Sequence, residues 1–311
     1  MATGDASESF QKYRYDPSKA AAVAVCAIFG VQFISMIIMI ATSSRRFDKM
    51  SASNERKVRN FTILRFLPFL VGIAIEAVGY GMRYMSANDT DKLTPYILQS
   101  VFLLVAPALY AATIYMVFGQ MLHYLQCTKL SIVPARWSTT IFVIGDVLSF
   151  FVQGAGAGIM ANADTSSGSK TGSNIIVVGL FVQVAVFSFF MITELRFLYR
   201  VKRTSAIVQY LSLHWRTLNL TLLGISLLIL IRSLVRAIEF IQGNKGFIIS
   251  HEYFLYVFDA LMMILATLVW IVTFKFGDIF KIIYEVKVLD SFKENSGDDA
   301  SYMQAEAFDK K

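Results

Sequence analysis

Seven apolar stretches, each roughly 20 residues long, divide this chain and constrain its fold more than any other feature. A helix of that length crosses the hydrocarbon core of a bilayer, which is about 30 Å thick. Only 16% of the 311 residues are charged, whereas soluble domains carry about 25%. The sequence therefore predicts an all-α, polytopic membrane protein with seven transmembrane helices. The spans are predicted at 19–43, 62–85, 95–121, 138–161, 174–198, 218–242 and 252–275.

The lysines and arginines between these spans are distributed unequally. Alternate loops are rich in them, with Arg45, Arg46, Lys49, Arg56, Lys57, Arg59, Lys129, Arg136, Arg200, Lys202, Arg203 and Arg216. The opposite loops contain only Lys92, Lys170 and Lys245, and the N-terminal segment adds Lys12 and Arg14. Because short cytoplasmic loops are enriched in basic residues, the N-terminus is predicted outside and the C-terminus in the cytosol.

Three segments follow from this topology. Residues 1–18 form an extracellular segment, 19–275 the transmembrane domain, and 276–311 a cytosolic tail. The tail is polar and poor in aliphatic residues, which predicts disorder. The first 18 residues contain acids and no apolar core, so we expect no cleavable signal peptide.

Charge and cysteine content exclude several other classes of protein. The net charge of +7 lies in loops rather than in a soluble basic module, so nucleic acid is not expected as a partner. Cys26 and Cys127 are far apart and predict no disulfide framework. Asn88 begins a glycosylation sequon on the predicted outer side, but its closeness to a helix end argues against its use.

The sixth span contains charges that a lipid-facing helix would not carry. The stretch "LLILIRSLVRAIEFIQG" includes Arg232, Arg236 and Glu239. Each central arginine costs about 2.5–3.5 kcal/mol on insertion scales, and each leucine or isoleucine returns only about 0.3–0.6 kcal/mol. The helix is therefore marginal alone, and we expect its charges to find partners in other spans.

Two other spans carry polar residues with the same spacing. Glu76, Tyr80 and Arg83 occur at i, i+4 and i+7 in the second span, and so do Glu252, Tyr256 and Asp259 in the seventh. This spacing places each set on one face of its helix. With the orientation above, both sets lie in the middle or outer half of the bilayer.

Two interpretations of these residues stay open. They are interhelical ion pairs that fix the packing of the bundle, or they line a polar cavity, open to the outer side, that receives a charged or amphiphilic ligand. We favour the cavity, because ionisable residues within a membrane usually mark a functional site. The predicted ligand site contains Glu76, Tyr80, Arg83, Gln153, Gln183, Arg232, Arg236, Glu239, His251, Glu252, Tyr256 and Asp259. Asp146 lies nearer the cytosol and stands apart.

Signatures of chemistry are weak in this chain. His123, His214 and His251 are the only histidines, and they fall at opposite ends of the predicted spans, so no metal site is expected. No phosphate-binding loop and no nucleophile-elbow motif occurs. We therefore predict neither an enzyme nor a resident cofactor.

Two further patterns concern packing. Gly154 and Gly158 form a small-xxx-small motif, which predicts close packing of the fourth span against a neighbour. Pro68 and Pro107 lie within the second and third spans, where proline is expected to kink a helix.

The segments that contain these polar residues also resemble those of a known protein family. "YRYDPSKAAAVA", "EAVGYGMR", "YILQSVFLLVAPALYAATIYMVFG", "GDVLSFFVQGAGAG" and "RSLVRAIEFIQG" followed by "SHEYFLYVFDA" resemble the blocks of the fungal lipid-translocating exporter family. The match runs in order from residue 13 to about 275. One position departs from it, because Gln120 stands where the family usually has arginine.

The resemblance implies a seven-span fungal protein linked to resistance against toxic sterols and sphingoid long-chain bases. Some relatives are linked to porphyrin or haem traffic instead. The family blocks include Glu76, Gly79, Tyr80, Arg83, Pro107, Tyr110, Tyr115, Asp146, Gln153, Gly154, Arg232, Arg236, Glu239, His251, Glu252 and Asp259.

Three functions are consistent with these observations. The first is translocation or export of amphiphilic membrane lipids, such as sphingoid long-chain bases, in the plasma membrane. The second is a seven-helix lipid sensor that signals to a protein partner through its basic cytosolic loops or tail. The third is transport of porphyrin or haem, in which arginines pair with propionates and His251 approaches the iron.

Overall fold

A computed structural model describes residues 17–50, 56–89, 93–125, 135–161, 166–204, 214–242, 246–248, 251–276 and 279–288. These residues form helices and short connecting segments, without a β-strand among them. Seven helical segments are long and apolar enough to cross a membrane. The predicted all-α class and the seven spans are therefore confirmed, whereas the orientation of the termini stays a prediction.

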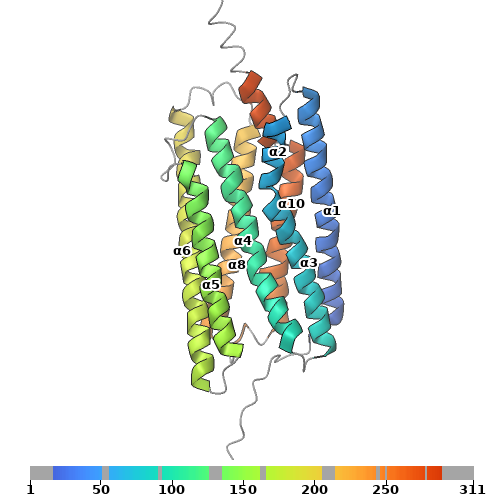
Figure 1. The fold of residues 1–311 in the computed structure, drawn as a ribbon, viewed down its shortest axis with the longest axis vertical. Coiled ribbons are helices and arrows are strands. Elements are labelled where there is room, and N and C mark those ends of the chain that lie inside the picture. Colours follow the sequence, from blue (N-terminus) through green and yellow to red (C-terminus); the bar gives the residue numbers. More distant parts are fainter. Residues whose placement is uncertain are drawn as a thin grey trace, which may run out of the picture.

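The elements follow one another in a simple order. They are α1 (Lys19–Met50), α2 (Arg56–Arg65), α3 (Leu67–Asn88), α4 (Leu93–Tyr124), α5 (Ala135–Ala161), α6 (Ser166–Thr204), α8 (His214–Gln242), α9 (Glu252–Leu255), η3 (Tyr256–Ala260) and α10 (Leu261–Phe276). The helices run roughly parallel to one long axis, with α5 and α6 on one side, α1 and α3 on the other, and α4 and α8 between them (Figure 1).

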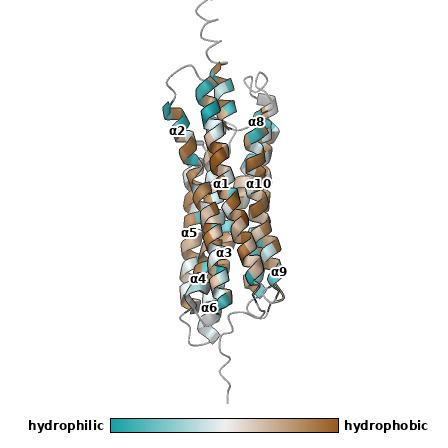
Figure 2. Cartoon of the chain, turned by 90° about the vertical axis from the view of Figure 1, so that its right-hand side faces the viewer, coloured by the Kyte–Doolittle hydropathy of each residue, from teal (hydrophilic) through white to brown (hydrophobic). Residues whose placement is uncertain are grey.

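The two ends of this bundle differ in composition from its middle. Brown, apolar segments form the central part of the helices, and teal, polar segments gather toward the ends (Figure 2). We call the end that holds Ser18, Asn88 and Gln242 the Glu252 end, and the end that holds Met50, Tyr124 and His214 the His214 end. The charge distribution predicts that the Glu252 end is extracellular.

The helices extend beyond the predicted spans. The fifth span was expected from residue 174, but α6 begins at Ser166 within the segment predicted as a loop. Beyond residue 275, the predicted limit of the transmembrane domain, residues 279–288 are helical and bury Phe280 and Ile283 in the core. The folded bundle therefore includes the start of the predicted tail, while residues 289–311 lie outside the described part.

The second span is broken near its start. A turn at Phe66 separates α2 from α3, and Pro68 occupies the first turn of α3, where the missing N–H of proline is tolerated. Gln120 of α4, at the position where the family usually has arginine, donates from Nε2 to Thr62 Oγ1 at 2.8 Å. This hydrogen bond ties α4 to α2 at the His214 end.

Glycines do bring α5 and α6 together, but not the two that the sequence indicated. A Cβ on Gly156 would lie 2.7 Å from the carbonyl oxygen of Gly172, so these backbones are in direct contact. A Cβ on Gly154 or Gly158 would meet nothing within 4 Å. The prediction that this pair packs against a neighbouring helix is wrong, because the helix turns both glycines away from α6.

Candidate ligand site among α3, α8 and η3

Asp259 lies at the centre of the largest charged cluster among the described residues. It belongs to η3, one turn of π-helix, a local irregularity that is frequent at functional sites. Arg232 Nη2 lies 2.5 Å from Asp259 Oδ1, and Arg236 Nε lies 3.5 Å from the same oxygen. Tyr80 of α3 donates its hydroxyl to Asp259 Oδ2 at 3.1 Å. One buried carboxylate thus connects three helical elements.

The two arginines have further partners. Arg232 Nη2 also donates to the main-chain oxygen of Leu103 on α4. Arg236 Nη1 donates to Glu239 Oε2 at 3.0 Å, one turn along α8. Both guanidiniums are therefore held by carboxylates, as a charge at this depth requires.

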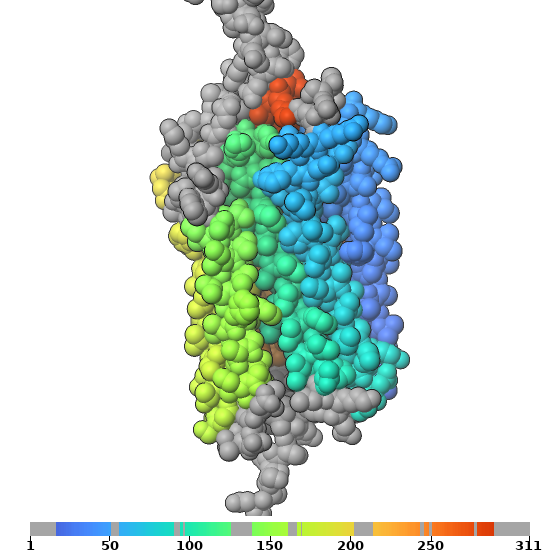
Figure 3. Space-filling view, viewed as in Figure 1, coloured from blue at the N-terminus to red at the C-terminus, as the bar shows by residue number. Residues whose placement is uncertain are grey.

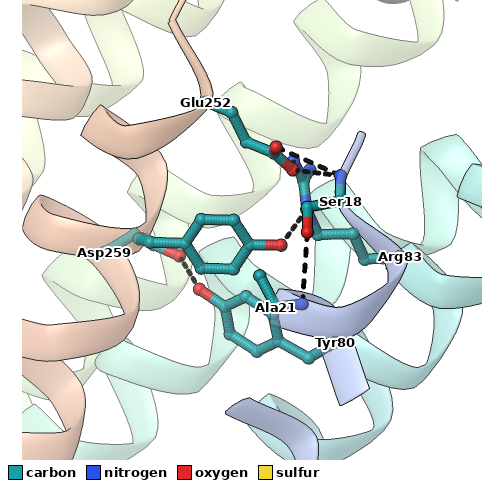
Figure 4. Close-up of polar contacts among 7 residues, drawn as sticks. Ser18, Ala21, Tyr80, Arg83, Glu252 and Asp259 are labelled. Carbon is teal, nitrogen blue, oxygen red and sulfur yellow. Dashed lines mark hydrogen bonds and ion pairs between the residues drawn. The ribbon is translucent and has the colours of Figure 1, made fainter. Parts of the chain in front are cut away.

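A second group of contacts continues the cluster toward the Glu252 end (Figure 4). Arg83 Nη2 donates to Glu252 Oε1 at 2.7 Å, and Arg83 Nε donates to the Tyr256 hydroxyl at 3.1 Å. The main-chain N–H of Ser18 donates to both oxygens of Glu252, at 3.0 and 3.1 Å. Glu252 therefore fastens the start of α1 to α3. The rings of Tyr80 and Tyr256 stack at 6.2 Å and join the two groups.

Glu76 differs from every other acid in the cluster. Its side chain is fully buried on α3, and neither carboxylate oxygen has a hydrogen-bond partner. Asp259, Arg232 and Arg236 are close enough to interact with it electrostatically. A buried carboxylate without a donor is costly, so Glu76 is the acid of the cluster best able to accept hydrogen bonds from a further donor.

The space inside the cluster is small. Arg232, Arg236, Glu239, His251 and Asp259 line a cavity of about 40 Å³. One water molecule occupies about 30 Å³, whereas pockets for small molecules measure about 300–1,000 Å³. The site is closed to a lipid head group in this conformation, and a ligand requires the ion pairs to move.

A larger groove lies elsewhere on the surface. It measures about 380 Å³ and runs over α1, α3 and α4, where Phe33, Val71 and Phe102 help to line it. All its lining residues are apolar. Val78 of the lining is two residues from Glu76 on α3 and therefore on a different face of the helix. The groove suits a hydrocarbon chain but is separate from the charged cluster.

Three of the predicted polar residues lie outside the cluster. Gln153 Nε2 donates to Gln183 Oε1 at 3.0 Å, which joins α5 to α6. Asp146 of α5 is buried and accepts a hydrogen bond from the Tyr115 hydroxyl at 2.9 Å. The described residues hold no group of three or more histidine, cysteine or acidic side chains arranged to bind a metal ion.

Sequence reasoning missed two participants and one buried acid. Ser18 and Leu103 contribute main-chain atoms, which no side-chain pattern marks. Glu194 of α6 is fully buried near the His214 end. In the sequence "MITELRFLYR", Glu194 stands close to basic residues, which suggests an exposed helix end. Its position within the apolar run was the only indication in the sequence that it is buried.

Comparison with known proteins identifies a family and several similar yeast proteins. Residues 69–282 match the model of the family described as "RTA1 like protein". The chain is 44% identical over 308 residues to "Protoporphyrin uptake protein 1" of Saccharomyces cerevisiae, covering 94% of this chain and all of that protein. It is 42% identical to "Protein RTM1" of the same yeast, covering 93% of this chain and 99% of the relative.

A more distant relative is named for a different cargo. The "Sphingoid long-chain base transporter RSB1" of Saccharomyces cerevisiae is 26% identical over 243 residues, which cover 65% of this chain and 61% of the relative. No solved structure matches. The family match covers most of the chain, and two of these yeast relatives are named for uptake or transport. The chain therefore belongs to the RTA1-like family of multi-pass membrane proteins.

Proposed function

We propose that this protein moves amphiphiles with a protonated amine, such as sphingoid long-chain bases, across the plasma membrane. The amine is held by Glu76 and Asp259, and the hydrocarbon tail stays in contact with lipid. The family supports this class of cargo through the relative named as a sphingoid long-chain base transporter.

The observation that carries the proposal is the state of Glu76. Its two oxygens are buried without a donor, although two guanidiniums lie close to it. The cluster contains three guanidiniums and four carboxylates, so a fully ionised cluster has one negative charge in excess. An ammonium group supplies both the missing charge and the missing hydrogen bonds.

Entry of the cargo requires the cluster to open. The weakest contact around Asp259 is the 3.5 Å approach of Arg236, and separating it would enlarge the cavity between α8 and η3. A narrow hollow also separates α4 from α5 in the half nearer the Glu252 end (Figure 3). This hollow supports entry of a lipid sideways from the bilayer, as in transporters whose sites lie between helix bundles.

The test is transport by purified protein. Liposomes that contain the protein and a fluorescent long-chain base on one leaflet report movement to the other leaflet. Wild-type protein accelerates this movement, and Glu76→Gln loses the acceleration because the amide carries no charge. Cells that express the Glu76→Gln or Arg236→Ala variant are expected to lose resistance to added sphingoid base.

Asp48→Asn is the matched control, because Asp48 pairs with Arg59 in an exposed position far from the cluster. It keeps full transport if the effect is local. Binding of the base without movement by the wild-type protein would favour a sensor instead, and full resistance with Glu76→Gln would refute the proposed amine site.

Porphyrin uptake is the second candidate, favoured by the relative that is 44% identical and named for it. Arg232 and Arg236 then pair with the propionates of the porphyrin, which displace Glu239 and Asp259. His251 lines the same small cavity, and its ring rests 4.3 Å from that of Phe247. If the cargo is haem, His251 is the residue placed to approach the iron.

Titration of the purified protein with protoporphyrin and with haem separates the two cargoes. A change in porphyrin fluorescence that is lost in Arg236→Gln but kept in Glu76→Gln supports porphyrin. A haem absorbance shift that is lost in His251→Ala adds the iron contact. Unchanged spectra with both compounds would leave the long-chain base as the cargo.

A further inference from the structure

A buried acid that the proposed ligand site does not use lies in the other half of the bundle. Glu194 belongs to α6 and to the candidate span Lys170–Val201. Its side chain is fully buried. Ser226 Oγ of α8 lies 3.4 Å from Glu194 Oε2, and Glu194 Oε1 has no hydrogen-bond partner.

The surroundings of Glu194 are aromatic. Phe190 and Phe197 stand one turn before and one turn after it on the same face of α6. Both rings pack edge-on against Phe118 of α4, at 5.5 and 5.6 Å. The carboxyl group is therefore buried between helix faces that carry these rings and beside α8, away from lipid and from water.

No counter-charge compensates this group in the described part of the chain. Among the described residues, the buried titratable side chains of α4, α5 and α8 are Tyr110, Tyr115, Asp146 and Arg232. Tyr110 is hydrogen-bonded to Thr267. Tyr115 is bound to Asp146, and Arg232 is bound to Asp259 and Leu103. Arg196, on α6 itself, is on an exposed face. An ionised carboxylate here would lose several kcal/mol of solvation without an ion pair to offset it.

A proton compensates the buried charge of Glu194 better than a metal ion does. Protonation removes the charge, and the neutral carboxyl still accepts the hydrogen bond that Ser226 Oγ donates to Oε2. A bound Mg²⁺ or Ca²⁺ needs about six oxygen ligands or more. The described residues offer no such set around Glu194.

Ser226 also belongs to a polar stripe along α8. Asn219, Ser226 and Ser233 are spaced by seven residues and are all buried, so they lie on one face. Neither polar atom of the Asn219 side chain has a partner. By the helical rise, Arg232 lies about 9 Å from Ser226. The stripe connects the His214 end of α8 to the charged cluster.

We infer that Glu194 is a proton-binding site, and that its loss and gain of a proton drives the charged cluster on α8 between closed and open states. The site itself rests on the geometry around Glu194, whereas the coupling rests on the proposed transport. When Glu194 loses its proton, the new charge is stable only if α6 and α8 separate and admit water. That movement displaces Ser226 and, on the same rigid helix, Arg232 and Arg236.

The first experiment detects the proton without any cargo. A hydrophobic carbodiimide adds to a protonated carboxyl within a membrane, and the adduct is located by mass spectrometry of the peptide from α6. Wild-type protein is labelled at Glu194, and labelling falls as the pH is raised. The Glu194→Gln peptide gains no label. No labelling at any pH, or protection by sodium ions at constant pH, would overturn the proton site.

The second experiment tests the coupling in liposomes. Movement of a fluorescent long-chain base by wild-type protein is faster with a pH gradient across the membrane than without one. Glu194→Gln loses this response, while the Asp48→Asn control keeps it. A wild-type protein that moves the base equally fast with and without the gradient overturns the coupling and leaves the transport proposal standing. If wild-type protein moves no base, the transport proposal fails and the labelling result alone decides the proton site.

Discussion

The two sides of the bundle stabilise buried polar groups in opposite ways. Where α3, α8 and η3 meet, Arg83, Arg232 and Arg236 are each paired with a carboxylate. Where α4, α5, α6 and α8 meet, the buried acids Asp146 and Glu194 each have a single hydroxyl partner. In a medium without water, a charge persists only near a counter-charge, as Glu76 has in Arg232 and Arg236, and an acid without one persists as the neutral form.

This difference predicts that the two sides respond differently to the loss of a charge. The paired side is held together by strong, specific contacts that a charged ligand competes for. The other side is held by aromatic packing and by the backbone contact of Gly156 with Gly172. Its acids are not part of an ion pair, so gain or loss of a proton changes their charge without breaking one. Removing a charge should therefore be severe on the first side and mild on the second.

The largest effect is expected for Asp259→Asn. The amide leaves Arg232 and Arg236 without their shared carboxylate in the interior, and breaking a buried pair in this way costs about 3–5 kcal/mol. We expect a marked fall in the thermal unfolding temperature of the protein in detergent micelles. Asp48→Asn, which breaks the exposed pair with Arg59, should cost about 0–1 kcal/mol. Equal losses for the two variants would contradict the division between the sides.

Glu252→Gln is expected to have the next largest effect. It weakens the hydrogen bonds from Arg83 and from the Ser18 N–H, and hydrogen bonds to charged groups are worth about 1.5–3 kcal/mol. Because Ser18 precedes α1, hydrogen exchange at the start of α1 should accelerate more than exchange in α5 or α6. Uniform acceleration over the whole chain would mean that Glu252 stabilises the bundle generally and does not anchor α1.

A smaller loss is expected for Gly156→Ala, which tests how α5 and α6 are joined. The new methyl group would lie 2.7 Å from the Gly172 carbonyl oxygen and 2.8 Å from the Ile176 nitrogen. Backbone atoms cannot turn aside, so the helices must separate, at a cost of about 1–3 kcal/mol. Gly154→Ala is the matched control, because its methyl group meets nothing within 4 Å. It should be neutral or slightly stabilising in unfolding measurements.

The glycines also show what could and could not be predicted from the sequence. The number of spans followed from apolar length, which depends on the bilayer alone. The spacing of Glu76, Tyr80 and Arg83 correctly indicated one face of α3, because helical periodicity is a local property. The small-xxx-small motif fits Gly154 and Gly158 but not Gly156, which makes the contact, because the rotation of α5 is set by contacts with α6.

For the charged residues too, the sequence indicated the face of a helix but not how neighbouring helices are rotated against each other. Matching depth on α8 and η3 suggested that Arg232 and Asp259 could meet, and the structure places them 2.5 Å apart. The π-turn that carries Asp259 changes the helical register locally and has no simple sequence signal. Gln153 and Gln183 were expected to face the cluster but pair with each other, because α5 and α6 pack through their own interface.

The smallest effect is expected where the acids stand alone. Glu194→Gln and Asp146→Asn keep the shape of the side chain and break no ion pair, so each should change the free energy of unfolding by less than about 1 kcal/mol. The measurement is the same thermal unfolding in micelles, with Asp259→Asn as the severe reference. A loss in Glu194→Gln as large as that of Asp259→Asn would mean that Glu194 is ionised and paired, which contradicts the proton site. A small loss, together with a lost response to the pH gradient, separates a role in the transport cycle from a role in folding.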